Sequence, residues 1–300
     1  MKLSISNSQN FSKLMIILLT VTTIAIVGCN KDDSVMNNDI ETAGLSANED
    51  AAESLASAVG EDNGGVIDQV GDLLESAEND GFSSLSKSGG LDGIESKEAV
   101  YDSINGVWTI TLFRERGNPD GVFYAQYERV YNVQFLNAAG NPQKRYITNG
   151  DTAYTVNFDI ISGTGYHRTR RLTHELKDLG GSLVATNANL PNVTINGTYA
   201  RAATDTVTTR NAERTLDYQL DIVLTDVVGP RGKRRDLSKK VSGEINGIYE
   251  AVATFTRGDA YVEKNISRTI HIVFGDGNAD IRVNGQRYSG DVSTGELITQ

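Results

Sequence analysis

Residues 214–220 read Arg-Thr-Leu-Asp-Tyr-Gln-Leu, and this stretch has the period of two that is typical of a half-buried β-strand. Apolar Leu216, Tyr218 and Leu220 alternate with polar side chains, so one face of the strand is predicted to be buried and the other solvated. An Arg followed by apolar residues at every second position occurs at three other places: Arg129-Tyr131-Val133-Phe135, Arg170-Leu172-His174-Leu176 and Arg268-Ile270-Ile272-Phe274. The sequence therefore predicts a β-rich domain over residues 98–300 with four hairpin repeats.

Five Asn-Gly pairs punctuate this domain. Asn-Gly between alternating apolar residues is a strong hairpin signal, because a type I′ turn needs positive φ at both central residues. A short strand before each pair brings the total to about a dozen strands. We expect an all-β fold in which an antiparallel meander curls into a barrel or half-barrel, because a flat sheet of this width leaves exposed edges. A small propeller is the alternative. The pairs are Asn105-Gly106, Asn149-Gly150, Asn196-Gly197, Asn246-Gly247 and Asn284-Gly285.

The chain before the repeats has a different composition. Residues 30–104 contain 18 acidic residues against three Lys, whereas residues 105–300 contain 21 acidic and 23 basic residues. We expect residues 29–97 to be an acidic tether with one or two short helices, since residues 50–59 are rich in Ala and residues 66–77 have apolar side chains at helical spacing. The apolar stripe is expected to bury against the downstream domain. Neither part has the large basic excess of a nucleic-acid binder, so no nucleic acid is expected as a partner.

The first 33 residues carry a targeting pattern. Residues 14–27 lack charged side chains but are too short to span a bilayer, for which about 20 residues are needed. This length and the Lys residues before it predict a signal peptide over residues 1–28. The run ends at Ile26-Val27-Gly28-Cys29, and Cys29 is the only cysteine of the chain. No intrachain disulfide can therefore form.

These residues resemble a bacterial lipoprotein signal, in which small residues precede an obligatory cysteine. The resemblance implies that Cys29 is diacylated, becomes the new amino terminus and is acylated again. Lys31, Asp32 and Asp33 resemble the export signal that sends lipoproteins to the outer face of the outer membrane in one phylum of Gram-negative bacteria. The body of the chain, with its ending from Ala279 to Gly285, loosely resembles uncharacterised β-rich surface lipoproteins. We therefore expect a lipid-anchored protein of the outer membrane that faces the cell exterior.

The arginines that open the repeats are the candidate anion-binding residues, because guanidinium groups suit carboxylate, sulfate or phosphate ligands. An acidic glycan or another polyanion is the corresponding partner. In the alternative interpretation, each arginine extends its stem over the core and pairs with a nearby acidic residue. If the short segments are separate strands, successive units run in opposite directions and the arginines are divided between two rims. The candidates are Arg129, Arg170, Arg214 and Arg268.

The sequence offers little for catalysis or metal binding. His174 falls on the apolar face of its strand and is predicted to be a core residue, whereas His271 is predicted to face solvent. The chain lacks the common nucleophile, zinc and phosphate-loop patterns, so no catalytic residue, metal or cofactor is expected. The favoured function is a membrane-anchored surface lipoprotein of a non-enzymatic binding or structural type. The alternatives are a carrier that holds an apolar ligand inside the curled sheet and a hydrolase that acts on surface polymers.

Overall fold

The computed structural model describes residues 47–62, 64–77, 93–232 and 237–298. All of these residues belong to one compact unit, Gly44–Gln300. The predicted signal peptide, the lipidation residue Cys29 and the export signal Lys31, Asp32 and Asp33 lie outside the described residues.

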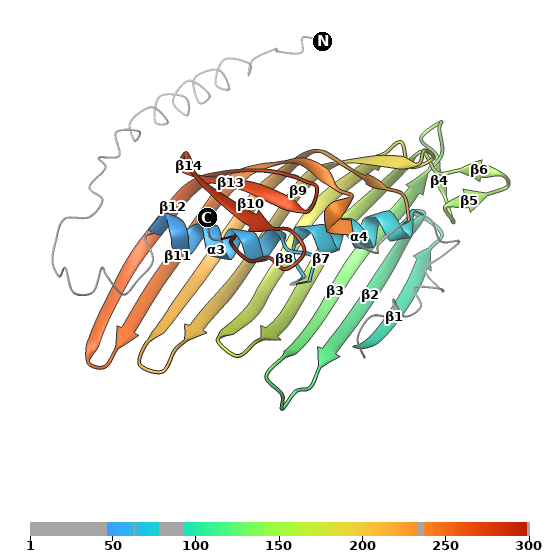
Figure 1. The fold of residues 1–300 in the computed structure, drawn as a ribbon. Helices are drawn as coiled ribbons and strands as arrows, with labels where there is room; N and C mark the ends of the chain where they lie inside the picture. The colour runs from blue at the N-terminus through green and yellow to red at the C-terminus, as the bar shows by residue number, and fades with distance from the viewer. Residues whose placement is uncertain (1–46, 63, 78–92, 233–236, 299–300) are drawn as a thin grey trace, which may run out of the picture. The chain divides into compact units, whose positions relative to one another are not determined.

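Twelve strands form one antiparallel sheet in this unit (Figure 1). The order is β1-β2-β3-β7-β8-β9-β10-β11-β12-β13-β14, with β4 attached to β3, and β5 and β6 form a separate small hairpin. This order confirms the predicted all-β meander. The sheet is open, since β1 and β14 end it without pairing to each other. One continuous sheet also rules out propeller blades.

The bounds show that the central strands are unusually long, up to 18 residues in β10. The strands are β1 Gly93–Asp102, β2 Val107–Gly117, β3 Tyr124–Leu136, β4 Pro142–Gln143, β5 Ile147–Thr148, β6 Asp151–Thr152, β7 Thr155–Arg168, β8 Leu172–Thr186, β9 Asn192–Thr208, β10 Glu213–Pro230, β11 Ser242–Arg257, β12 Ala260–Gly275, β13 Asn278–Val283 and β14 Gln286–Asp291.

Two helices, α3 (Ala47–Val59) and α4 (Val66–Ser76), pack across the inner face of the sheet (Figure 1). Their apolar side chains are fully buried with those of the strands, and full burial of each large one contributes about 1.5–3 kcal/mol. Both predicted helices are confirmed, and so is the burial of the stripe against the domain. The expected domain boundary at residue 98 falls inside β1, and the helices belong to the core of the compact unit.

Side chains alternate between the two faces of the sheet as the period of two predicts. In β10, Leu216, Tyr218 and Leu220 are buried against the helices, whereas Asp217 and Gln219 are exposed on the outer face. The other three repeats follow the same pattern over most of their length. The buried face is the inner one because only there do the helices exclude water.

The Asn-Gly pairs form two groups. Those at residues 149–150 and 284–285 have positive φ at both positions and join short hairpins, as predicted, and Gly106 also has positive φ in the β1–β2 turn. The prediction is wrong for Asn196-Gly197 and Asn246-Gly247, which lie inside β9 and β11. A Cβ atom on Gly197 or Gly247 would stand 2.1 Å from a carbonyl oxygen of the neighbouring strand. These glycines are required by close strand contact rather than by a turn.

The four long hairpins turn at the same rim of the sheet (Figure 1). In the register, the end of β2 and the start of β3 lie beside the end of β7. The start of β8 lies beside the end of β9, and the start of β10 lies beside the end of β11, which turns into β12 at the same edge. The division of the repeat arginines between two rims is therefore wrong. Its premise fails because the segments before residues 196 and 246 are parts of β9 and β11 and not separate strands.

The first and last described segments of the compact unit meet. The backbone N–H of Glu61, between the helices, donates to the carbonyl of Val292 at 2.8 Å, and that of Asp62 donates to Ser293 at 2.9 Å. Gly60 lies so close to Gly295 that a Cβ there would be 2.7 Å from its Cα. The segment after β14 thus closes over the loop between α3 and α4.

Candidate functional site

Arg129, the first candidate arginine, is buried beneath α4. Its Nη1 atom lies 2.5 Å from Asp68 and 3.3 Å from Asp72, and its Nη2 donates to the carbonyl of Gly64 at 3.0 Å. Burial alone would lower the pKa of the Arg129 guanidinium, but Tyr131 and the two carboxylates outweigh it and hold the pKa above its ordinary value. Arg129 is therefore a charged, fully used partner of the helix.

Arg214 and Arg268 also point toward a helix. Arg214 lies 2.9 Å from Asp50 and contacts Glu53, both on α3, and Lys264 lies 2.6 Å from the other oxygen of Asp50. The Nε atom of Arg268 donates to the side chain of Asn48 at 2.6 Å. Both residues join the sheet to α3. Arg214 pairs with acidic residues, as the pairing interpretation expects, whereas the partner of Arg268 is the amide of Asn48.

Arg170 is different, because it lies at the apex of the turn between β7 and β8. Its side chain is exposed and has no hydrogen bond or ion pair with the described part of the chain. The four candidates are therefore not brought together into one site. Three of them hold the helices on the inner face, and the fourth projects from the rim.

A buried polar group surrounds His174 on the inner face. Its Nδ1 lies 2.6 Å from Asp205, which also accepts from the Ser54 hydroxyl at 3.1 Å, and its Nε2 lies 2.8 Å from Arg201. Because the arginine can only donate, Nε2 accepts and Nδ1–H donates to the carboxylate. The histidine and the carboxylate are at most 6% exposed at the side chain. His174 is thus a satisfied core residue, as predicted, and His271 lies 3.1 Å from Glu244 on the outer face.

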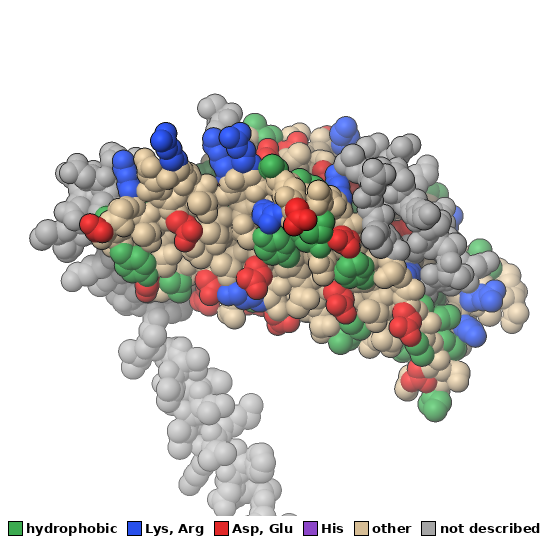
Figure 2. Space-filling view, turned by 90° about the horizontal axis from the view of Figure 1, so that it is seen from below, with side chains coloured by type: hydrophobic (Ala, Val, Ile, Leu, Met, Phe, Trp, Pro, Cys, Tyr) green, Lys and Arg blue, Asp and Glu red, His purple; other side chains and the backbone are tan. Residues whose placement is uncertain are grey.

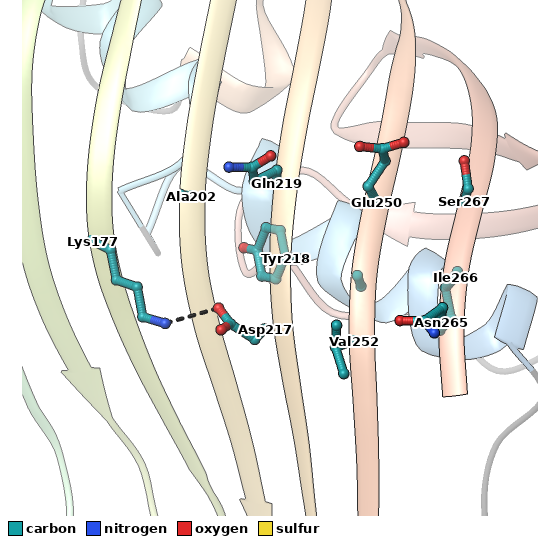
Figure 3. A pocket seen from close by; sticks show the side chains of 11 residues that line it. Lys177, Ala202, Asp217, Tyr218, Gln219, Glu250, Val252, Asn265, Ile266 and Ser267 are labelled. Carbon is teal, nitrogen blue, oxygen red and sulfur yellow. Dashed lines mark hydrogen bonds and ion pairs between the residues drawn. The ribbon is translucent and has the colours of Figure 1, made fainter. Parts of the chain in front are cut away.

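The outer face has a shallow trough of about 610 Å³ over strands β8 to β12 (Figure 3). Glu250 is paired in register with Gln219 on one side and Ser267 on the other, and Val252 stands likewise between Asp217 and Asn265. Two rows of mostly polar side chains therefore cross the strands. The lining residues are Lys177, Ala202, Asp217, Tyr218, Gln219, Glu250, Ala251, Val252, Asn265, Ile266 and Ser267.

Hydrogen-bonding groups in the trough are only partly used. Lys177 lies 2.8 Å from Asp217, which also accepts from Thr204 at 3.1 Å. Gln219, Glu250 and Asn265 make no side-chain hydrogen bond within the described residues. Planar amide and carboxylate groups of this kind can bind hydroxyl-bearing ligands. The sequence analysis missed this site, whose only signal was the polar set at every second position of each strand.

Comparison with known proteins gives no relative. Neither a protein-family model, nor a curated protein, nor a solved structure matches the chain. Within the described ranges, three or more His, Cys, Asp or Glu side chains do not gather where they could hold a metal ion. The helices of the described part are also too short or too polar to cross a membrane. Function must therefore be argued from the chain itself.

Proposed function

We propose that the protein is a lipid-anchored surface lipoprotein of the outer membrane, whose β-sheet acts as a non-enzymatic binding or structural module. The targeting part of the proposal is supported by the residues around Cys29 and by Lys31, Asp32 and Asp33. The molecular part is supported by one observation above all, which is that the inner face of the sheet is filled by helices of the same chain.

The filled inner face favours this proposal over a carrier of apolar ligands. Such a carrier needs space inside the curled sheet. Leu55, Ile67 and Leu73 of the two helices occupy that position and are themselves fully buried. The outer face is the broad surface left for a partner, and its trough offers hydrogen-bonding groups among apolar ones.

The same geometry gives little support to hydrolysis. The histidine and carboxylate pair of His174 and Asp205 is buried beneath α3 and does not line the trough. In the trough, Asp217 is engaged by Lys177, and its register partner in β11 is Val252 rather than a second acid or a histidine. A binding or structural role therefore requires less rearrangement than catalysis.

Mass spectrometry of the protein from a Gram-negative host with the lipoprotein pathway tests the anchor. We expect the mature chain to start at an acylated Cys29 and the Cys29→Ser variant to be neither acylated nor cut after Gly28. An unmodified thiol on an uncut chain would overturn the proposal.

Surface display is tested separately in a host that uses this export signal. The chain carrying Lys31→Ala, Asp32→Ala and Asp33→Ala is expected to be acylated normally but to be protected from protease added outside the cell. The unchanged chain is expected to be digested. Equal digestion of both chains would remove the export role of these residues, and equal protection would place the protein on the inner side.

A further inference from the structure

The rim formed by the four long hairpin turns carries exposed arginines. Arg170 and Arg171 lie in the β7–β8 turn, Arg210 in the β9–β10 turn and Arg257 at the end of β11. All four side chains are exposed and make no hydrogen bond or ion pair with the residues that the structure describes. The fold thus brings together free guanidinium groups from three separate hairpins.

The same rim exposes apolar side chains at its two ends. In the β2–β3 turn Val122 is 66% exposed and Phe123 is 37% exposed, and at the start of β12 Tyr261 is 60% exposed and Val262 is 37% exposed. Figure 2 looks at the molecule from below, where this rim lies in Figure 1, and shows hydrophobic side chains interspersed with basic and acidic ones. Exposed apolar groups beside free arginines are typical of surfaces that bind a lipid interface.

The charge balance of the rim is basic. Besides the four free arginines, Arg116 and Arg168 lie at the β2–β3 and β7–β8 turns, where Arg168 donates to two backbone carbonyls of the first turn. Asp120, Glu213 and Asp259 are the acidic residues of the turns, Glu263 accepts from the Tyr261 hydroxyl at 2.7 Å, and Asp62 lies 3.9 Å from Arg116. Six arginines against these five carboxylates leave a small excess of positive charge, and the four arginines without a partner are the charges available to a ligand.

The spacing of the turns indicates an extended anionic surface rather than one small ion. Neighbouring strands lie about 4.8 Å apart, so neighbouring hairpins of this meander lie about 10 Å apart. The guanidinium groups of different turns are therefore too far apart to hold one phosphate together, but each can meet a separate head group.

We propose that the hairpin rim docks on an anionic, phosphate-bearing membrane surface, with Arg170, Arg171, Arg210 and Arg257 contacting phosphates and Val122 and Tyr261 entering the interface. Asp217, Asp221 and Glu250 are exposed on the outer face. They would be repelled if the sheet lay flat, so the sheet stands upright on its rim. A linear acidic glycan could meet the arginines but gives no role to the apolar tips.

Vesicle flotation tests the rim without the lipid anchor. The probe is the chain from residue 29 with Cys29→Ser, which contains the whole compact unit, mixed with vesicles of phosphatidylethanolamine and phosphatidylglycerol. Each arginine near such a surface contributes about 1 kcal/mol, or about fivefold in partitioning. Replacing the four free arginines by Ala is expected to lower binding by about 600-fold.

A matched control removes the same charge elsewhere. Arg145→Ala, Lys240→Ala, Arg282→Ala and Arg287→Ala together change four basic residues away from the rim and should lower binding by less than about fivefold. Val122→Ser with Tyr261→Ser should lower the binding that remains at high salt by about tenfold. Circular dichroism is expected to show that all the variants remain folded, because the changed side chains are exposed.

Three results would overturn the proposal. They are absence of binding by the parent chain, equal losses in the rim and control variants, and arginine-dependent binding to dextran sulfate without binding to vesicles. Acylation of Cys29 is read in a different experiment on a different chain. Failure of the rim proposal therefore leaves the lipoprotein proposal intact, and failure of acylation leaves the vesicle result intact.

Discussion

Arg129 and Arg170 occupy the same position in two sequence repeats but have opposite environments. Arg129 is 1% exposed and is held by two carboxylates of α4, whereas Arg170 projects from a turn and is exposed. The difference follows from strand length. β3 continues for five residues before Arg129, so this residue lies under the helix, whereas β8 begins two residues after Arg170. A repeat position therefore fixes the face of the sheet but not the distance from its rim.

The largest expected effect is that of Arg129→Ala. Removing the guanidinium takes the nearer cation from Asp68, which keeps only Arg114 at 3.4 Å, and also removes the hydrogen bond to the Gly64 carbonyl. Asp72 keeps Arg114 at 2.5 Å, so the free energy of unfolding should fall by about 3–4 kcal/mol. Urea unfolding followed by circular dichroism measures this change. Arg170→Ala is the matched control and should change the free energy by less than about 0.5 kcal/mol. Similar losses in the two variants would contradict the comparison.

A pH titration gives the next largest effect, at a histidine between the helix-covered inner face and the exposed rim. His167 lies near the rim against Phe123, and burial, with help from His174 and Arg116, lowers its pKa from 6.5 to about 4. The unfolded chain then binds a proton below pH 6.5 that the folded chain does not bind. Stability should therefore fall by about 3 kcal/mol as the pH drops from 6.5 to 4.

The variant His167→Gln identifies the source of this loss. Its free energy of unfolding should be lower than that of the parent chain at pH 7. Between pH 6.5 and 5, however, it should decrease less than that of the parent chain. Burial raises the pKa of Glu61 and of Asp62, and protonation of these groups acts in the opposite direction. Both chains keep these two residues, so the difference between their slopes isolates the histidine. An unchanged slope in the variant would show that another group is responsible.

Arg214→Ala should have an intermediate effect. Its carboxylate partner Asp50 is buried but keeps Lys264 at 2.6 Å, and its second partner Glu53 is half exposed. The expected loss of unfolding free energy is about 1–2 kcal/mol. Adding Lys264→Ala should cost more than the two single changes together, because Asp50 then has no cation. Strict additivity would contradict this account.

The smallest expected effects belong to the exposed rim. Arg210→Ala and Arg257→Ala should each leave the free energy of unfolding in urea within about 0.5 kcal/mol of the parent chain, since neither side chain has a partner among the described residues. A loss above about 1 kcal/mol would show that the rim arginines stabilise the fold. They would then be poor candidates for membrane contact.

Much of the fold could be predicted because it rests on local periodicity. The alternation in residues 214–220 correctly gave the buried face, and the stripe over residues 66–77 correctly gave α4 and its burial. Turn chemistry was less reliable. Asn-Gly looks the same whether positive φ or close strand contact requires the glycine, so Gly197 could not be separated from Gly150 without the register.

The sites were harder to predict, because pairing between distant residues leaves no local signal. Asp68 and Asp72 lie in the stretch over residues 66–77 that was predicted to be helical, but their contact with Arg129 spans about 60 residues. The trough depends on register in the same way, since it brings Lys177 of β8 beside Asp217 of β10. The targeting residues around Cys29 differ from these sites, because their signal is local and can be read from the sequence. They lie outside the described residues, so the structure does not test them.

The meeting of the loop at Glu61 with Val292 has a consequence for the order of events in the cell. The helices are synthesised about 230 residues before the segment that closes over their loop, so this part of the core cannot be completed until that segment has been made. Contacts of such long sequence separation form slowly. A chain whose core closes only after residue 292 has been made stays unfolded for longer, and an unfolded polypeptide is the form that can be threaded through a translocation pore.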